Sequence, residues 1–185
     1  MDVKGSALGS IREFVMNEFG REGLDRWLDA LPVASRELHA AAIRLDSWYP
    51  LREMMIEPTE KICELFFGGD LKGAWEGGRF SADFALHGIY RLFVKLGSVD
   101  SLINRASLIF ATYYKPSALR VAESEKNRVS MQITLFPEMH TIVERRIGGW
   151  MERAVEISGQ KNVKVEIARS LTVGDPCTEF VATWE

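Results

Sequence analysis

The chain has 185 residues, of which 46% are hydrophobic and 10% aromatic, so it is long enough to bury a sizeable core without disulfides or metals. Its formal net charge is −3, with acidic and basic residues interleaved, which disfavours nucleic acid as a partner because no basic face stands out. No apolar run reaches the roughly 20 residues that a membrane span needs.

The N-terminus and the cysteines indicate a cellular compartment. The first six residues lack the basic region and apolar stretch of an export signal. Cys63 and Cys177 lie far apart in segments of apolar pattern, which favours two reduced, packed thiols over a disulfide framework. We therefore expect a cytoplasmic protein.

The first 115 residues have the periodicity of helices. Residues 6–19 and 22–31 form an expected helical hairpin around Gly20, and Trp48-Tyr49-Pro50 forms an extended crossing. The later glycines Gly73, Gly77 and Gly78 are expected to allow close packing. The remaining expected helices are residues 35–42, a helix from Pro58 to the Gly68-Gly69 pair, and residues 71–86, 88–96 and 99–114.

Residues 116–185 alternate between apolar and polar positions, as strands do. Residues 119–135 predict a hairpin around the turn 124–127, and the last strands are expected at 163–167 and 178–184. A long helix, predicted to open at Pro137 and to close at Gly159, separates the two pairs.

The predicted fold class is therefore α+β. A single domain, residues 1–185, is expected to consist of a helical part, residues 1–115, packed on a four-stranded antiparallel sheet of β-β-α-β-β order, residues 116–185. The crossing helix covers one sheet face, and we expect the N-terminal helices or a partner to cover the other.

Four segments carry a resemblance to a known superfamily, and their order covers nearly the whole chain. They are Val3-Lys4-Gly5-Ser6, Trp48-Tyr49-Pro50, His87-Gly88-Ile89-Tyr90-Arg91 and Gly174-Asp175-Pro176-Cys177-Thr178-Glu179-Phe180. The order resembles the superfamily of haem nitric-oxide/oxygen-binding domains, vinyl-reductase-type small-molecule sensor domains and TRAPP vesicle-tethering subunits, and most of all its uncharacterised bacterial members. The resemblance implies a helical subdomain on an antiparallel sheet, with an apolar internal cavity that relatives use for haem, aromatic effectors or a fatty acyl chain.

Haem binding in these relatives needs a proximal histidine and a Tyr-x-Ser-x-Arg trio. The expected helix 99–114 contains no histidine and has Asn104 near the ligand position, and no such trio follows Pro116. We therefore predict no cofactor and disfavour haem. His87 leaves haem binding as an alternative.

The sequence predicts no metal site. His140 and Glu144 lie four residues apart on one expected helix, and Cys177 lies near Glu179, but two ligands do not make a site. We interpret them as an exposed His-Glu pair and a buried thiol. The charged runs 144–146 and 152–153 are interpreted as a solvated helix face.

Six residues are candidates for lining the cavity. His87 is the expected polar anchor, and the other candidates are aromatic or charged; the six are Trp48, Tyr49, His87, Tyr90, Arg91 and Tyr113. The alternatives are a histidine bonded to backbone and aromatic residues at the edge of the core. Trp150 is expected to pack on the sheet.

No nucleophile elbow, phosphate loop or paired carboxylate motif occurs, so we expect no enzyme. The first functional hypothesis is a ligand-binding or sensory domain for a small hydrophobic molecule, signalling through a homodimer or a partner protein. The alternatives are a structural assembly module that resembles tethering-complex subunits, and a haem-based gas sensor, which the missing ligands disfavour.

Overall fold

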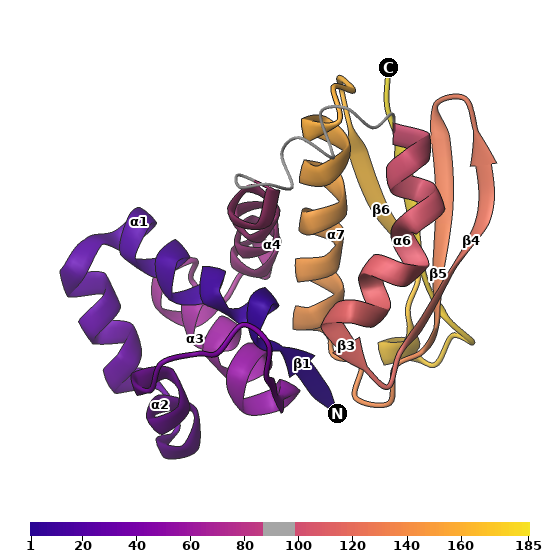
Figure 1. Cartoon of the computed structure of the whole chain (residues 1–185). Coiled ribbons are helices and arrows are strands. Elements are labelled where there is room, and N and C mark those ends of the chain that lie inside the picture. The colour runs from indigo at the N-terminus through magenta and orange to yellow at the C-terminus, as the bar shows by residue number, and fades with distance from the viewer. Residues whose placement is uncertain (87–98) are drawn as a thin grey trace.

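A computed structural model describes residues 1–86 and 99–185 (Figure 1). The expected helix 88–96 and the candidate residues His87, Tyr90 and Arg91 lie outside the described residues. Helices and two antiparallel sheets make up the described part, which confirms the predicted α+β class.

The N-terminal hairpin consists of two helical arms, separated by a kink at Gly20. α1 (Gly5–Ala30) changes direction at Gly20, whose φ of 68° lies in the left-handed region that glycine tolerates best. The predicted helices 6–19 and 22–31 are its two arms. α2 (Val33–Ala40) follows directly after Pro32, which cannot continue the preceding helix.

The helical segment that contains Pro58 begins earlier than this proline suggests. A π-helical turn, η1 (Arg52–Ile56), runs without interruption into α3 (Glu57–Phe66), so Pro58 lies in the first turn of α3 and not at the start of the helical segment. α4 (Lys72–Leu86) and α6 (Val99–Tyr113) agree with the predicted helices to within one residue at each end.

A small sheet, which the sequence pattern did not predict, joins three distant segments. β1 (Asp2–Lys4) pairs on one side with β2 (Trp48–Pro50) and on the other with β3 (Tyr114–Lys115), both antiparallel. Strands of two or three residues are too short to show alternation. The extended crossing at 48–50 is thus an edge strand of this sheet.

The larger sheet has the predicted β-β-α-β-β order. It consists of β4 (Ala118–Glu125), β5 (Arg128–Leu135), β6 (Lys164–Arg169) and β7 (Thr178–Thr183), arranged β4-β5-β7-β6. A short 3-10 helix, η2 (Leu171–Val173), lies between β6 and β7. The central pair β5–β7 brings Met131 opposite Phe180.

The crossing helix, α7 (Thr141–Ile157), starts later than predicted. The Nδ1 atom of His140 accepts the backbone N–H of Ile142, so His140 is the N-cap and Pro137 lies outside the helix. Proline favours a first helical turn, but a side-chain acceptor that satisfies a free N–H fixes the helix start.

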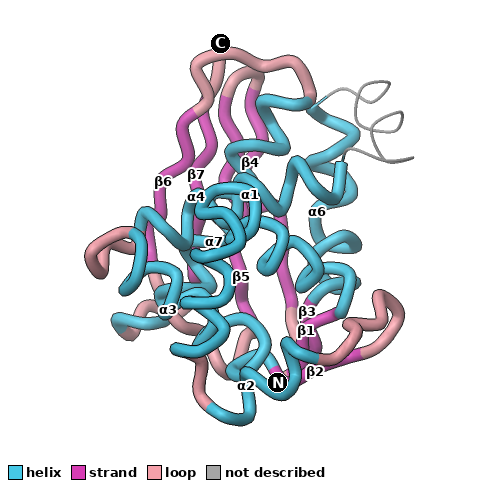
Figure 2. The backbone as a smooth tube through the Cα atoms, turned by 90° about the vertical axis from the view of Figure 1, so that its left-hand side faces the viewer, coloured by secondary structure: helices cyan, strands magenta, loops and turns pink. Residues whose placement is uncertain are grey.

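The α-helices of the described part of the chain lie on one side of the large sheet. In Figures 1 and 2, α6 and α7 lie against the sheet, and α1, α3 and α4 lie beyond α7. The N-terminal helices therefore do not cover the other face of the sheet, and that part of the prediction is wrong. That face carries polar side chains that bind one another: Ser130 and Gln132 both donate to Glu179, at 2.5 and 3.1 Å.

Glycines bring α4 and α7 into backbone contact, as the sequence predicted for Gly77 and Gly78. A Cβ atom on Gly78 would overlap the carbonyl oxygen of Arg146, and one on Gly149 would overlap the carbonyl oxygen of Trp75. Only glycine allows two helices to approach so closely. This contact fixes the position of α7 relative to the helical part.

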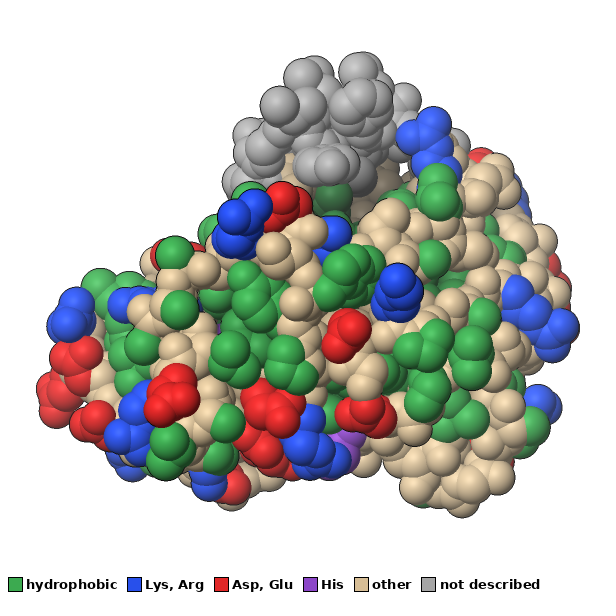
Figure 3. All heavy atoms as spheres, turned by 60° about the horizontal axis from the view of Figure 1, so that its bottom comes forward, with side chains coloured by type: hydrophobic (Ala, Val, Ile, Leu, Met, Phe, Trp, Pro, Cys, Tyr) green, Lys and Arg blue, Asp and Glu red, His purple; other side chains and the backbone are tan. Residues whose placement is uncertain are grey.

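The surface carries charges of both signs. On the face drawn in Figure 3, acidic and basic side chains are interspersed among hydrophobic ones. The most exposed large hydrophobic residues, Val33, Leu108 and Val173, come from α2, α6 and η2. These features do not single out a partner surface, and the homodimer or partner protein stays a prediction. No helix in the described ranges 1–86 and 99–185 has the length and apolar character to cross a membrane.

Candidate functional site

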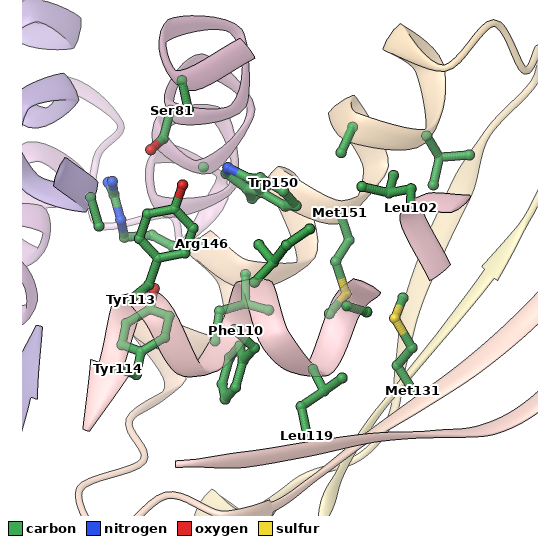
Figure 4. Close-up of a pocket in the computed structure, with 18 of the residues that line it drawn as sticks. Ser81, Leu102, Phe110, Tyr113, Tyr114, Leu119, Met131, Arg146, Trp150 and Met151 are labelled. Carbon is green, nitrogen blue, oxygen red and sulfur yellow. The ribbon is translucent and has the colours of Figure 1, made fainter. Parts of the chain in front are cut away.

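A cavity of about 90 Å³ lies between α6, α7 and the inner face of β4 and β5 (Figure 4). The start of α1 and the middle of α4 also line it. Most of the residues around it are hydrophobic or aromatic, which is usual for small-molecule sites. The residues around it include Ser81, Ala106, Tyr113, Tyr114, Met131 and Arg146.

The apolar side of the cavity follows from the two periodicities of the sequence. Val129 and Met131 are two positions apart along β5, so both side chains point to the helix-covered face of the sheet. Ile147 and Met151 lie one turn apart on α7 and face them. The sheet and α7 thus supply the hydrophobic walls.

The polar groups gather at the opposite end. Figure 4 shows Ser81, Tyr113, Tyr114 and Arg146 grouped at one end, whereas Leu102 and Met131 lie toward the other. Burial raises the pKa of Tyr114 to about 12, so its hydroxyl stays protonated at neutral pH. The cavity is therefore amphipathic, with hydroxyl groups and a guanidinium at one end.

Arg146 is a candidate site residue that the sequence interpretation missed. It is only 4% exposed, and its Nη1 atom has no hydrogen-bond partner among the described residues. Burial lowers the pKa of its guanidinium. The interpretation of 144–146 as a solvated helix face is wrong here, and a signal was present: Arg146 lies between Ile142 and Trp150 on the apolar stripe of α7.

Glu144 is also buried, at 2% exposure, and it is not paired with His140. Ser170 donates to its carboxylate at 2.8 Å and Thr178 at 2.5 Å. His140 instead has its Nε2 atom 3.5 Å from Glu60 of α3. The interpretation of an exposed His-Glu pair is wrong, because Glu144 is buried and bonds Ser170, which follows β6, and Thr178, the first residue of β7.

The second charged run of α7 contacts α4. Arg153 donates to Asp83 at 2.9 Å and to Glu156 at 2.7 Å, and Arg79 bonds both Glu152 and Glu156. These side chains are only partly exposed and form one ion-pair network between the two helices. The interpretation of residues 152–153 as a solvated helix face is therefore wrong.

Three of the six candidate site residues, Trp48, Tyr49 and Tyr113, lie within the described part of the chain, and they lie in two different regions. Tyr113 lines the cavity. Trp48 and Tyr49 lie in β2, where the Lys4 ammonium sits 4.7 Å from the Trp48 ring centre and the Tyr49 hydroxyl accepts the N–H of Arg44. Neither residue lines the cavity. Roles for all six in ligand binding stay predictions.

Residues with metal-ligand chemistry are dispersed. No group of three or more His, Cys, Asp or Glu side chains that could hold a metal ion occurs within residues 1–86 and 99–185. Cys177 is a buried free thiol, and Glu179 accepts hydrogen bonds from Ser130 and Gln132. Cys63 is a second buried thiol, whose pKa burial raises.

Comparison with known proteins identifies the fold. No protein-family model matches the sequence, and no curated protein matches it. Among solved structures, the chain is similar to an H-NOX protein from S. oneidensis in the Fe(II)NO state, with 12% identity, a TM-score of 0.74, and coverage of 98% of this chain and 99% of that one.

Two further H-NOX structures agree. The unliganded Fe(II) protein from K. algicida is 12% identical with a TM-score of 0.69, covering 98% of this chain and 96% of that one. A variant of the T. tengcongensis protein is 12% identical with a TM-score of 0.63, covering 98% and 97%. The fold expected from the resemblance, that of haem nitric-oxide/oxygen-binding domains, is confirmed.

The prediction of no cofactor is contradicted by these neighbours, because they are Fe(II) H-NOX proteins and point to haem. The described cavity residues supply part of what haem requires. Arg146 is a buried cation suited to a carboxylate, and the walls are apolar. None of the described lining residues is a histidine or a cysteine, so we derive no chemistry through iron.

Proposed function

We propose that this chain is a ligand-binding sensory domain whose ligand occupies the cavity between α6, α7 and the large sheet. The ligand class is a small, mainly apolar molecule. The observation that carries the proposal is the amphipathic cavity itself, which has hydrophobic walls and an unpaired buried arginine at one end. The H-NOX neighbours support it, because their fold carries a bound group in Fe(II) states.

The cavity connects the two parts of the chain. α6 and α7 both line it, while α7 is held to α4 through backbone contact and the Arg79 ion pairs. A ligand that separates α6 from α7 therefore strains a helix that is fixed to the N-terminal helices. This arrangement supports a sensory role, because occupancy at one site changes the position of elements at another.

The test is native mass spectrometry of the purified protein, together with its visible absorption spectrum. We expect one small molecule bound per chain, and the neighbours make haem, with its Soret band, the first molecule to look for. Ala106→Phe places an aromatic ring in the cavity and should abolish binding. A protein that binds no small molecule, before or after incubation with hemin and octanol, would contradict the proposal.

A matched control lies on the same helix. Ala111 is exposed on α6, so Ala111→Phe adds the same ring without entering the cavity. This variant should bind as the unchanged protein does. If both variants lose the ligand equally while circular dichroism shows that both are folded, the cavity is not the binding site.

A further inference from the structure

The charged residues of α7 differ in whether their side chains have hydrogen-bond partners. Glu144 is held by Ser170 and Thr178, and Arg153 is held by Asp83 and Glu156. Arg146 is buried in the same helix, yet its Nη1 atom has no partner in the described part of the chain. Burying a charge without a partner is costly, so an arrangement that leaves one unpaired calls for a reason.

No side chain in the described part of the chain supplies the missing anion. The two groups whose negative forms would favour the charge on Arg146 are Tyr114 and Cys63. Burial raises the pKa of both, so both are neutral at pH 7. No carboxylate of the described residues forms an ion pair with Arg146, and residues 87–98 contain no Asp or Glu.

The fold makes room for this guanidinium. A Cβ atom on Gly77 would lie 2.8 Å from Arg146 Nη1, and a Cβ atom on Gly78 would overlap the backbone of Arg146. Glycines at both positions let the arginine lie between α4 and α7 at the edge of the cavity (Figure 4). The N–H groups of a planar guanidinium form a fork that matches a carboxylate.

We propose that Arg146 anchors the carboxylate of the ligand, whose apolar body lies between α6, α7 and the sheet. This inference rests on the proposed function and specifies its ligand as an apolar molecule that carries a carboxylate. Two sources share that chemistry, a haem propionate and a free aliphatic or aromatic acid. Tyr113, Tyr114 and Ser81 line the same end of the cavity and offer hydroxyl groups to the second carboxylate oxygen.

The first arm of the test compares octanoate with octanol, which share a chain and differ in charge. The unchanged protein should bind octanoate at least about tenfold more tightly, since a hydrogen bond to a charged group contributes about 1.5 to 3 kcal/mol. Arg146→Gln should remove this preference, so that this variant binds octanoate and octanol about equally. Arg145→Gln, at the exposed neighbouring position, should keep the preference.

The second arm compares hemin with its dimethyl ester, followed by the Soret absorbance. If hemin binds through Arg146 and the ester does not, the carboxylate comes from haem. If octanoate alone shows the dependence, it comes from a free acid. Arg146→Lys, which keeps the charge without the fork, should retain part of the preference, and circular dichroism checks the fold of each variant.

A preference for the acid that persists in Arg146→Gln would overturn the proposal, as would equal binding of octanoate and octanol to the unchanged protein. Failure of the anchor differs from failure of the proposed function. Octanol binding that Ala106→Phe abolishes, without any preference for the acid, would refute the anchor alone. Absence of binding by every probe would refute both.

Discussion

Two buried ionisable residues, His39 and Arg146, show how burial sets the charge of single side chains in this protein. His39 is 1% exposed, and its Nε2 atom lies 3.2 Å from the carbonyl oxygen of Met54, so Nε2 carries the proton. Burial lowers the pKa of His39 to about 4. The imidazole is therefore neutral in the folded protein at pH 7.

The pKa of His39 makes stability depend on pH. Between about pH 6.5 and pH 4 the unfolded chain binds a proton at His39 and the folded chain does not, so the unfolding free energy falls as the pH falls. The full loss amounts to about 3 kcal/mol. Urea unfolding at pH 6.5 and pH 5 should show this decrease, and His39→Gln, which keeps a donor for Met54, should show much less of it.

The outcome that contradicts this account is a parallel decrease in the two proteins. In that case another group titrates across the same range, and the imidazole of His39 is solvated or protonated in the folded state.

Arg146 gives the opposite prediction for stability. Replacing an unpaired buried charge with a hydrophobic side chain of similar length should raise the unfolding free energy of the ligand-free protein, by about 1 to 4 kcal/mol for Arg146→Met. Arg145→Met, at the exposed neighbouring position, should change it by less than about 0.5 kcal/mol. Denaturant unfolding of both variants measures the difference. A marked loss of stability in Arg146→Met would mean that the protein itself pairs the guanidinium.

At the scale of elements, the contact between α4 and α7 depends on glycine. Gly78→Ala should lower the unfolding free energy by about 1 to 3 kcal/mol, because its Cβ overlaps the backbone of α7 and forces the helices apart. Gly9→Ala is the matched control: its Cβ would meet Phe84 at an ordinary distance of 3.7 Å. The control should gain up to about 1 kcal/mol from helix propensity. Equal effects of the two substitutions would refute the close contact.

The helices and the four long strands are predictable from sequence because their periodicity extends over many residues. α4, α6 and the β4–β5 hairpin lie where the pattern of apolar residues puts them. The three-stranded sheet is not predictable in this way, because strands such as β1 pair only with distant segments and are too short for a pattern. Tertiary pairing, and not local preference, forms this sheet.

The candidate site was harder to predict than the fold, for a physical reason. Tyr113 was selected and does line the cavity, whereas Arg146 was assigned to solvent because its sequence neighbours are charged. Its burial depends on Gly77 and Gly78 of another helix, which no local pattern of α7 contains. The cofactor prediction failed for a related reason: it depended on missing local motifs, while the whole fold matches Fe(II) H-NOX proteins.

For the whole molecule, the fold is retained at only 12% identity to H-NOX structures that the chain matches over 98% of its length. Fold alone does not specify the ligand, because function depends on the groups that line a site. In this chain those groups form an amphipathic cavity at the junction of the helical part and the large sheet. The central claim is that this cavity binds an apolar carboxylate through Arg146.

The most direct measurement is a crystal structure of the unchanged protein grown with octanoate. The account predicts that the aliphatic chain lies between α6 and α7, against Met131 of the sheet, with a carboxylate oxygen about 3 Å from a guanidinium nitrogen of Arg146. Octanoate bound in the cavity with its carboxylate directed away from Arg146, or bound only outside the cavity, would contradict it.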